Sequence, residues 1–175
     1  MTTTAAPTLY ESFALYGSGV TLITVRDADA DRFFVAGSVL TASVAPFTLA
    51  VSAGRDRDAV PAITGGATWT VNVLADRHLP LVRQLTARTT RQERLDALHA
   101  AGAVPSEDGP LWLPDALVTF WCTARSVTTV HDQELLVGEV SRGSEHQDGH
   151  PLLRWHRDFV TIAPLAPASA SPDRS

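Results

Sequence analysis

The stretch from Gly37 to Asp58, GSVLTASVAPFTLAVSAGRDRD, places small hydroxylated residues before a proline-marked turn, an apolar strand and a charged turn. Backbone N–H groups, hydroxyls and guanidinium groups in this order suit a flat ligand that carries phosphate. The stretch therefore predicts a ligand-binding edge of a β-sheet.

The composition indicates one globular domain and removes several kinds of chemistry. The chain has 175 residues, of which 45% are hydrophobic, enough for a substantial core. Its formal charge is −5, and all 14 basic residues are arginine because the sequence contains no lysine. Schiff-base chemistry and a phosphate-loop lysine are therefore excluded. An acidic chain without a basic block also argues against nucleic acid as a partner.

The number of cysteines and the composition of the terminal segments indicate the cellular compartment in which the protein is expected. Cys122 is the only cysteine, so no disulfide forms within the chain, and a cytoplasmic protein is expected. Residues 1–7 lack the features of a secretory signal, and no segment reaches the ~18 apolar residues of a membrane helix. Residues 1–7 and 163–175 are expected to be disordered tails around a domain at 8–162.

Most of the domain has the alternation and β-branched content of strands. Seven strands are expected, at 20–25, 32–39, 47–52, 67–74, 116–130, 134–142 and 155–162. In the strand at 67–74, Trp69 and Val71 should face the core, while Thr70 and Asn72 point to the other side. Strands joined mostly by short turns favour a closed antiparallel barrel with helices outside it.

Helices are expected at 8–17, 76–85 and 90–102, with a brief helical turn at 58–63. Thr8 with Glu11 and Thr90 with Glu93 have the spacing of capping boxes, which predicts where two of these helices begin. Asp58 is expected to cap the helical turn.

Arg55 and Arg57 follow the apolar strand within the charged turn. They could bind a phosphate through charge-assisted hydrogen bonds, or they could form local ion pairs with Asp56 and Asp58. Spacing alone favours the ion pairs.

Other polar residues near the expected strand ends each have two interpretations. Ser38 and Thr41 could donate hydroxyls to a ligand or satisfy backbone groups at a strand end. Trp155 and His156 could cover a planar ring or belong to the core and its rim.

Histidine and cysteine give no metal or nucleophile site. His146 and His150 have helical metal-ligand spacing but lie in a loop of Gly, Ser and Asp that will not form a helix, so no metal is expected. Cys122 lies within an apolar strand and is expected to be a buried structural thiol.

Five blocks occur in order along the chain: GSGVTLIT at 17–24, SVLTASVAP at 38–46, VNVL at 71–74, Cys122 and VGEV at 137–140. In this order they resemble the short-chain flavin reductases, the FMN-binding split-barrel family, whose blocks read TGVTVVT, SFTSVSLDP, VNVL and VGEV. The resemblance covers about residues 10–162.

The resemblance implies a mainly β fold, a six-stranded antiparallel split β-barrel with flanking helices, usually a homodimer that binds FMN or FAD at the subunit interface. It implies that NADH or NADPH reduces the flavin, often for a separate flavin-dependent monooxygenase. The two cofactors carry the hydride chemistry, and the protein stacks and orients them.

Carried over by position, the resemblance assigns most of the binding site to the opening stretch. By position, Ser38, Val39, Leu40 and Thr41 are expected at the flavin ring and ribityl chain, and Ser52, Ala53 and Arg55 at the phosphate. The residues themselves add Arg57 at the phosphate, and Trp155 and His156 over the ring, to the expected cofactor-binding set. Two carboxylates, Asp56 and Asp58, are unfavourable beside a phosphate unless arginine neutralises them.

The family's Gly-Asp-His turn, whose histidine lies near flavin and nicotinamide, reads His131-Asp132-Gln133 here. Gln133 can hydrogen-bond but cannot carry a proton. By alternation, His131 should point to the same side and could partly substitute, so both are the expected catalytic positions.

The function expected is an NAD(P)H:flavin oxidoreductase that supplies reduced flavin to a monooxygenase. One alternative is a reductase-inactive carrier of flavin or another small molecule, or a partner subunit. A flavin-independent enzyme built on the same pocket is another.

Overall fold

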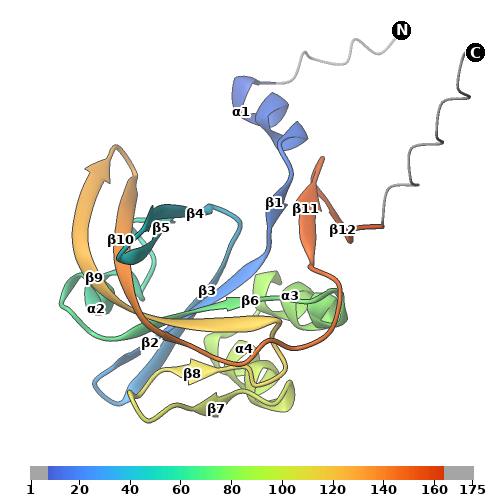
Figure 1. The fold of residues 1–175 in the computed structure, drawn as a ribbon. Coiled ribbons are helices and arrows are strands. Elements are labelled where there is room, and N and C mark those ends of the chain that lie inside the picture. The colour runs from blue at the N-terminus through green and yellow to red at the C-terminus, as the bar shows by residue number, and fades with distance from the viewer. Residues whose placement is uncertain (1–7, 164–175) are drawn as a thin grey trace, which may run out of the picture.

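A computed structural model describes residues 8–163 of the chain (Figure 1). The tails expected at 1–7 and 163–175 lie outside this range, apart from Ala163. No helix within the described residues is long and apolar enough to cross a lipid bilayer.

One large antiparallel sheet of seven strands forms the body of the protein. The strands follow in space as β3 (Ala30–Ala36), β2 (Thr21–Asp27), β6 (Trp69–Val73), β9 (Val118–Val130), β10 (Gln133–Gly143), β5 (Phe47–Gly54) and β4 (Val39–Val44). Within residues 8–163 no ladder joins the edge strands β3 and β4, so the sheet is open. The expected closed barrel is thus corrected to an open sheet, and the sheet has seven strands instead of six.

Strand β4 was not expected as a strand of its own. It pairs with β5 from Val39 opposite Val51 to Val44 opposite Phe47, with an irregularity between Thr41 and Ser43. Most of its residues are exposed, so the sequence lacks the alternation of a half-buried strand. Its pairing with β5 places the first half of the opening stretch beside the second half.

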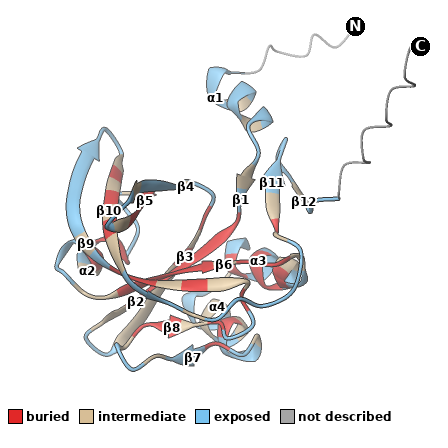
Figure 2. Ribbon diagram, viewed as in Figure 1, coloured by how far each residue is buried: buried red, intermediate tan, exposed pale blue. Residues whose placement is uncertain are grey.

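Strand β6 has buried residues on both of its faces (Figure 2). Trp69 and Val71 belong to one hydrophobic cluster, as expected. Thr70 and Asn72 are also fully buried, so the expectation of a single core face was wrong. The reason is a satisfied polar network, in which the Asn72 side-chain amide donates to Leu22 O at 3.0 Å and accepts from Leu113 N at 2.9 Å.

The core consists of two hydrophobic clusters, and helices cover both of them. Val60 and Ile63 of α2 (Val60–Thr64) pack into the cluster of Trp69, whereas Leu22 on the other face packs with α3 (Leu79–Thr86) and α4 (Arg91–Ala100). The short 3-10 helix η2 (Asp76–His78) precedes α3. The capping box of α4 is confirmed, but Asp58 does not cap α2, because its carboxylate accepts from Arg32 instead.

The N-terminal arm, residues 8–17, projects from this body (Figure 1). It holds α1 (Leu9–Ser12), which has the expected capping box, and the 3-10 helix η1 (Phe13–Leu15). Strand β1 (Ser18–Gly19) then pairs with β11 (Leu153–Trp155), which pairs with β12 (Asp158–Val160). The single strand expected at 155–162 is therefore a hairpin, because His156 and Arg157 turn the chain at positive φ. A small ladder of β7 (Val104–Pro105) and β8 (Leu111–Trp112) lies in the expected loop at 103–114.

Candidate functional site

A groove of about 880 Å³ lies between the N-terminal arm and the ends of β3, β4, β5 and β10. Its sheet wall includes five of the predicted cofactor residues: Ser38, Val39, Leu40, Ser52 and Ala53. Arg57 and Gln133 also line it. The structure thus brings together most of the site expected from the opening stretch.

Two serines fix the sheet wall where β4 meets β5. The Ser38 hydroxyl donates to the Ser52 carbonyl at 2.6 Å, and Ser52 N donates to the Ser38 carbonyl at 3.2 Å. The Ser38 hydroxyl is therefore already used as a donor, although its oxygen can still accept. Leu40 is 57% exposed, whereas the exposed Thr41 lies outside the groove lining.

Aromatic side chains of the N-terminal arm form the opposite wall. Tyr10, Phe13 and Tyr16 line the groove, and the rings of Phe13 and Tyr16 stack with centroids 5.2 Å apart. These rings supply the flat apolar surface that a planar ligand needs. They were not part of the predicted site because residues 8–17 were expected only to form a helix.

Trp155 and His156 hold the arm and do not line the groove. Trp155 Nε1 donates to Leu15 O at 3.1 Å, and His156 N donates to Ala14 O at 2.8 Å. The next residue, Arg157, forms an ion pair with Glu11. The arm is thus fixed to the β11–β12 hairpin by backbone and ionic contacts.

Charged groups at the arm end of the groove are Glu11, Arg154 and Arg157. The pKa of Glu11 is lowered, first by the Thr8 backbone N–H and then by the Arg157 guanidinium. Neither arginine was predicted for the site, since the sequence around them carries no recognised motif.

The two arginines of the charged turn have different partners. Arg55 Nε lies 3.1 Å from the buried carboxylate of Glu134, which also accepts from the Thr129 hydroxyl. Arg57 has no ion pair within residues 8–163, lines the groove, and lies 5.7 Å above the Phe34 ring. The local ion pairs with Asp56 and Asp58 are not formed, so Arg57 is the turn's arginine with an open guanidinium.

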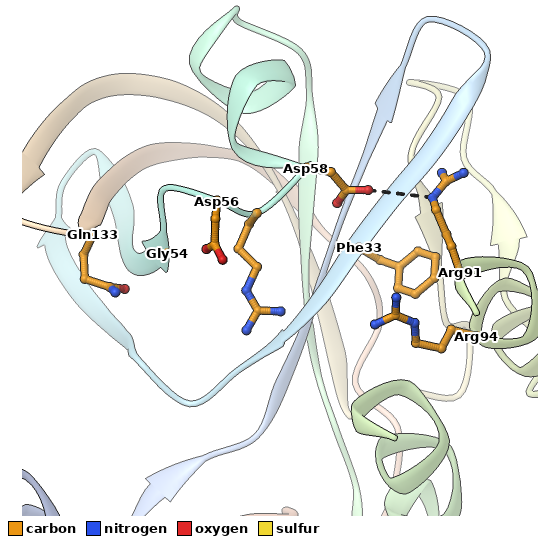
Figure 3. A pocket seen from close by; sticks show the side chains of 8 residues that line it. Phe33, Gly54, Asp56, Asp58, Arg91, Arg94 and Gln133 are labelled. Carbon is orange, nitrogen blue, oxygen red and sulfur yellow. Dashed lines mark ion pairs between the residues drawn. The ribbon is translucent and has the colours of Figure 1, made fainter. Parts of the chain in front are cut away.

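A second pocket of about 460 Å³, the arginine pocket, adjoins the groove (Figure 3). Its lining comprises Phe33, Gly54, Asp56, Arg57, Asp58, Arg91, Arg94 and Gln133. Asp58 lies 3.0 Å from Arg32 Nη1 and 3.7 Å from Arg91 Nε. Arginines of β3 and α4 therefore neutralise this carboxylate, in place of the neighbouring arginines considered from the sequence.

The hairpin between β9 and β10 places His131 and Gln133 differently. His131 is exposed at the tip, with φ of 54°. It lines neither the groove nor the arginine pocket, nor a third pocket of about 490 Å³ that is bounded by Gly54, Arg55, Asp56, Asp132 and Gln133. Gln133 begins β10 opposite Val130 and lines all three. Alternation does not carry through a turn with positive φ, so it cannot place His131 beside Gln133.

Cys122 is fully buried, and burial raises the pKa of its thiol to about 12, which confirms the expected structural role. Within the described part of the chain, no three His, Cys, Asp or Glu side chains are grouped to hold a metal ion.

Comparison with known protein families identifies the family to which this sequence belongs. The family model described as "Flavin reductase like domain" matches residues 13–163. The chain belongs to the flavin reductase-like family. The match spans the main sheet, residues 13–17 of the N-terminal arm, and the groove lining apart from Tyr10 and Glu11.

Individual relatives agree with the family. An NADH:riboflavin 5′-phosphate oxidoreductase of Streptomyces pristinaespiralis is 30% identical over 166 residues, which cover 91% of this chain and 90% of that protein. An NADH:FAD oxidoreductase of Streptomyces globisporus shares the fold with a TM-score of 0.80 and 20% identity, over 97% of this chain and 99% of that one. BorF, the flavin reductase component of a bacterial two-component tryptophan halogenase, has a TM-score of 0.79 and 20% identity, over 90% and 98%.

Proposed function

We propose that this flavin reductase-like protein uses NADH to reduce FMN or FAD bound in the groove. The observation that carries the proposal is a single groove with a flat aromatic wall, a β4–β5 edge opposite, and the open guanidinium of Arg57 at one end. The sequence relative from S. pristinaespiralis, named as an NADH-dependent reductase of riboflavin 5′-phosphate, supports the same assignment.

The groove fits a flavin in size and lining. Its volume of about 880 Å³ lies in the range of small-molecule sites, roughly 300–1,000 Å³. We assign the ring to the space between Val39 and Leu40 on the sheet side and Phe13 and Tyr16 on the arm. A bound flavin supplies the acceptor for the hydride of the reduced nicotinamide.

The protein's own residues position the reactants. Arg57 would hold the flavin phosphate with charge-assisted hydrogen bonds, and the Ser52–Ala53 backbone would approach the same end. Arg55 would act indirectly, because its pairing with Glu134 fixes the turn that carries Arg57. Gln133 would hydrogen-bond at the junction of ring and phosphate, and we assign it the position of the family's histidine in preference to His131.

We also propose that the open main sheet is the family's split barrel, with β4 added as a seventh strand at its edge. A second copy of the chain would cover the N-terminal arm, where Leu9, Tyr10, Phe13 and Tyr16 are between 66% and 93% exposed. Three of these side chains, Tyr10, Phe13 and Tyr16, also line the groove, and such exposed apolar groups favour a homodimer whose partner closes it. Sedimentation analysis should then give a dimer.

The reduced flavin would pass to a separate flavin-dependent monooxygenase. Support comes from BorF, which is named as the reductase component of a two-component system. A buried, unreactive single cysteine suits the cytoplasm, where we place the protein.

The test is anaerobic mixing of the protein with NADH and FMN or FAD, followed at the oxidised-flavin absorbance near ~450 nm. Enzyme-dependent bleaching is the expected result, with NADPH and enzyme-free mixtures as controls. Flavin that is retained in equilibrium dialysis but not bleached would instead support the carrier. A protein that neither binds nor reduces flavin would overturn the proposal and leave a flavin-independent use of the pocket.

A further inference from the structure

The arginine pocket and the groove share a wall. Gly54, Arg57 and Gln133 line both cavities, so a ligand held at Arg57 in the groove also meets the mouth of the arginine pocket. Figure 3 shows Gln133 and Gly54 on one side of that pocket, and Arg91 and Arg94 of α4 on the other. Phe33 is the one apolar side chain in the lining of the arginine pocket. The pocket therefore suits charged groups better than a second flat ring.

The charges in the arginine pocket leave a cationic excess. Its lining includes three guanidinium groups and the carboxylates of Asp56 and Asp58. Asp58 is already paired with Arg32, which lies outside the lining, and with Arg91. Within residues 8–163 neither Arg57 nor Arg94 forms an ion pair, so two guanidinium groups face the pocket against one unpaired carboxylate.

The side chain of Arg94 lines the arginine pocket and has no hydrogen-bond or ion-pair partner among the described residues. Its Nε atom is buried and has no hydrogen-bond partner among the described residues. Because Nε is covered, a ligand in the pocket would meet the terminal nitrogens of Arg94, which form no hydrogen bond or ion pair in the described part of the chain. Arg91 and Arg94 are three residues apart on α4, so both side chains lie on the same side of the helix and can hold one anion together.

We propose that the arginine pocket is a second phosphate subsite, and that it receives the diphosphate of FAD. The inference rests on the proposed function, because the flavin ring must occupy the groove for its phosphate to reach Arg57. A single phosphate, as in FMN, is satisfied at Arg57. A second phosphate extends from Arg57 toward Arg94, so the protein should bind FAD more tightly than FMN.

The experiment measures dissociation constants for FAD and FMN by equilibrium dialysis with the full chain. Arg94→Gln removes the charge but keeps a side chain of similar length, and Arg94→Lys restores the charge without the forked donors. Arg88→Gln is the matched control, since Arg88 is an exposed arginine two residues before α4's N-cap and outside the pocket. Unchanged urea midpoints would show that the variants fold.

The expected result is that Arg94→Gln weakens FAD binding about tenfold and FMN binding less than about twofold, as loss of one charge-assisted hydrogen bond predicts. Arg94→Lys should recover part of the FAD affinity, and Arg88→Gln should change neither ligand. Equal loss for FMN and FAD would assign Arg94 to the phosphate that both share and overturn the inference. A higher KM for NADPH with unchanged flavin binding would assign the pocket to the nicotinamide nucleotide and overturn it as well.

The two proposals fail in different ways. A wild-type protein that neither binds nor reduces either flavin overturns the reductase itself. A wild-type protein that reduces both flavins, while Arg94→Gln leaves FAD binding unchanged, overturns the second subsite alone.

Discussion

Helices α1 and α4 both begin with a Thr-x-x-Glu capping box, yet only α4 is packed into the body of the protein. Leu98 of α4 is fully buried against the sheet, whereas Leu9 of α1 is 93% exposed. A capping box therefore fixes where a helix begins, and burial of its apolar face decides whether it contributes to global stability.

This difference separates the molecule into two regions with different tasks. The body, meaning the main sheet with α2, α3 and α4, carries both hydrophobic clusters. The N-terminal arm is fixed by contacts at Trp155, His156 and Arg157, and it forms a wall of the groove. Substitutions in the body should therefore lower the free energy of unfolding, while substitutions in the arm should mainly change flavin binding.

The largest effect is expected at Gly138 in β10. A Cβ atom there would lie 2.4 Å from Cζ2 of the buried Trp69 and 3.1 Å from the Cβ of Cys122. Gly138→Val should lower the free energy of unfolding by about 3 kcal/mol or more, because the core cannot take the added volume. Urea unfolding measures it, with Gly19→Ala as the control, since a Cβ at Gly19 meets nothing within 4 Å. Equal unfolding midpoints for wild type and Gly138→Val would show that the body is loosely packed.

The second effect concerns the polar network beneath the sheet. Asn72→Ala removes the acceptor of Leu113 N and of the Thr119 hydroxyl, both at 2.9 Å, and leaves these buried donors unpaired. The expected loss is about 2 kcal/mol of unfolding free energy. Gln92→Ala removes an exposed amide that bonds Asp96 and should cost less than about 0.5 kcal/mol. Similar losses for the two variants would contradict the role given to burial.

The third effect compares the two caps directly. Thr90→Ala should cost the body about 1 kcal/mol, the usual value of an N-cap hydroxyl. Thr8→Ala removes the same bond from the N-terminal arm and should leave urea unfolding of the body unchanged while it raises the KM for flavin. A Thr8→Ala variant with a lowered midpoint and normal flavin kinetics would place the arm within the cooperative body.

The sequence predicts the parts of this fold that depend on neighbouring residues. Both capping boxes and the two long hairpins follow from spacing and β-branched content, and they are confirmed. The β11–β12 hairpin was missed because His156 and Arg157 turn at positive φ without the glycine or asparagine that normally marks such a turn. Buried Asn72 was missed because its partners at Leu22 and Leu113 lie 50 and 41 residues away.

The same limit applies to the candidate site. The opening stretch supplies the sheet wall of the groove, since its residues are contiguous and pair as β4 and β5. Arg91 and Arg94 reach the charged turn from α4, and no local pattern announces that approach. Their three-residue spacing behind a capping box shows only that they share a helix face, which is also typical of a solvated surface.

The smallest effect is a fall in the unfolding free energy of the body at acidic pH, and it comes from Glu93. Hydrogen bonds from the Thr89 hydroxyl and then from Thr90 lower the pKa of Glu93 from 4.5 to about 2. The folded protein holds this proton more weakly than the unfolded chain, so the stabilisation is complete above about pH 4.5 and is lost as the pH falls toward about 2. Glu93→Gln should therefore lower stability at neutral pH and flatten its dependence on pH in that window.

Glu11 is the matched position in the arm, because its pKa is also lowered, first by the Thr8 backbone N–H and then by Arg157. If the arm lies outside the cooperative body, Glu11→Gln should leave the unfolding free energy of the body unchanged from about pH 5 to about pH 2. Urea unfolding of both variants across this range makes the comparison. If Glu11→Gln and Glu93→Gln flatten the pH dependence of the unfolding free energy equally, the arm unfolds together with the sheet. The exposed apolar side chains of the arm would then require a partner even for stability.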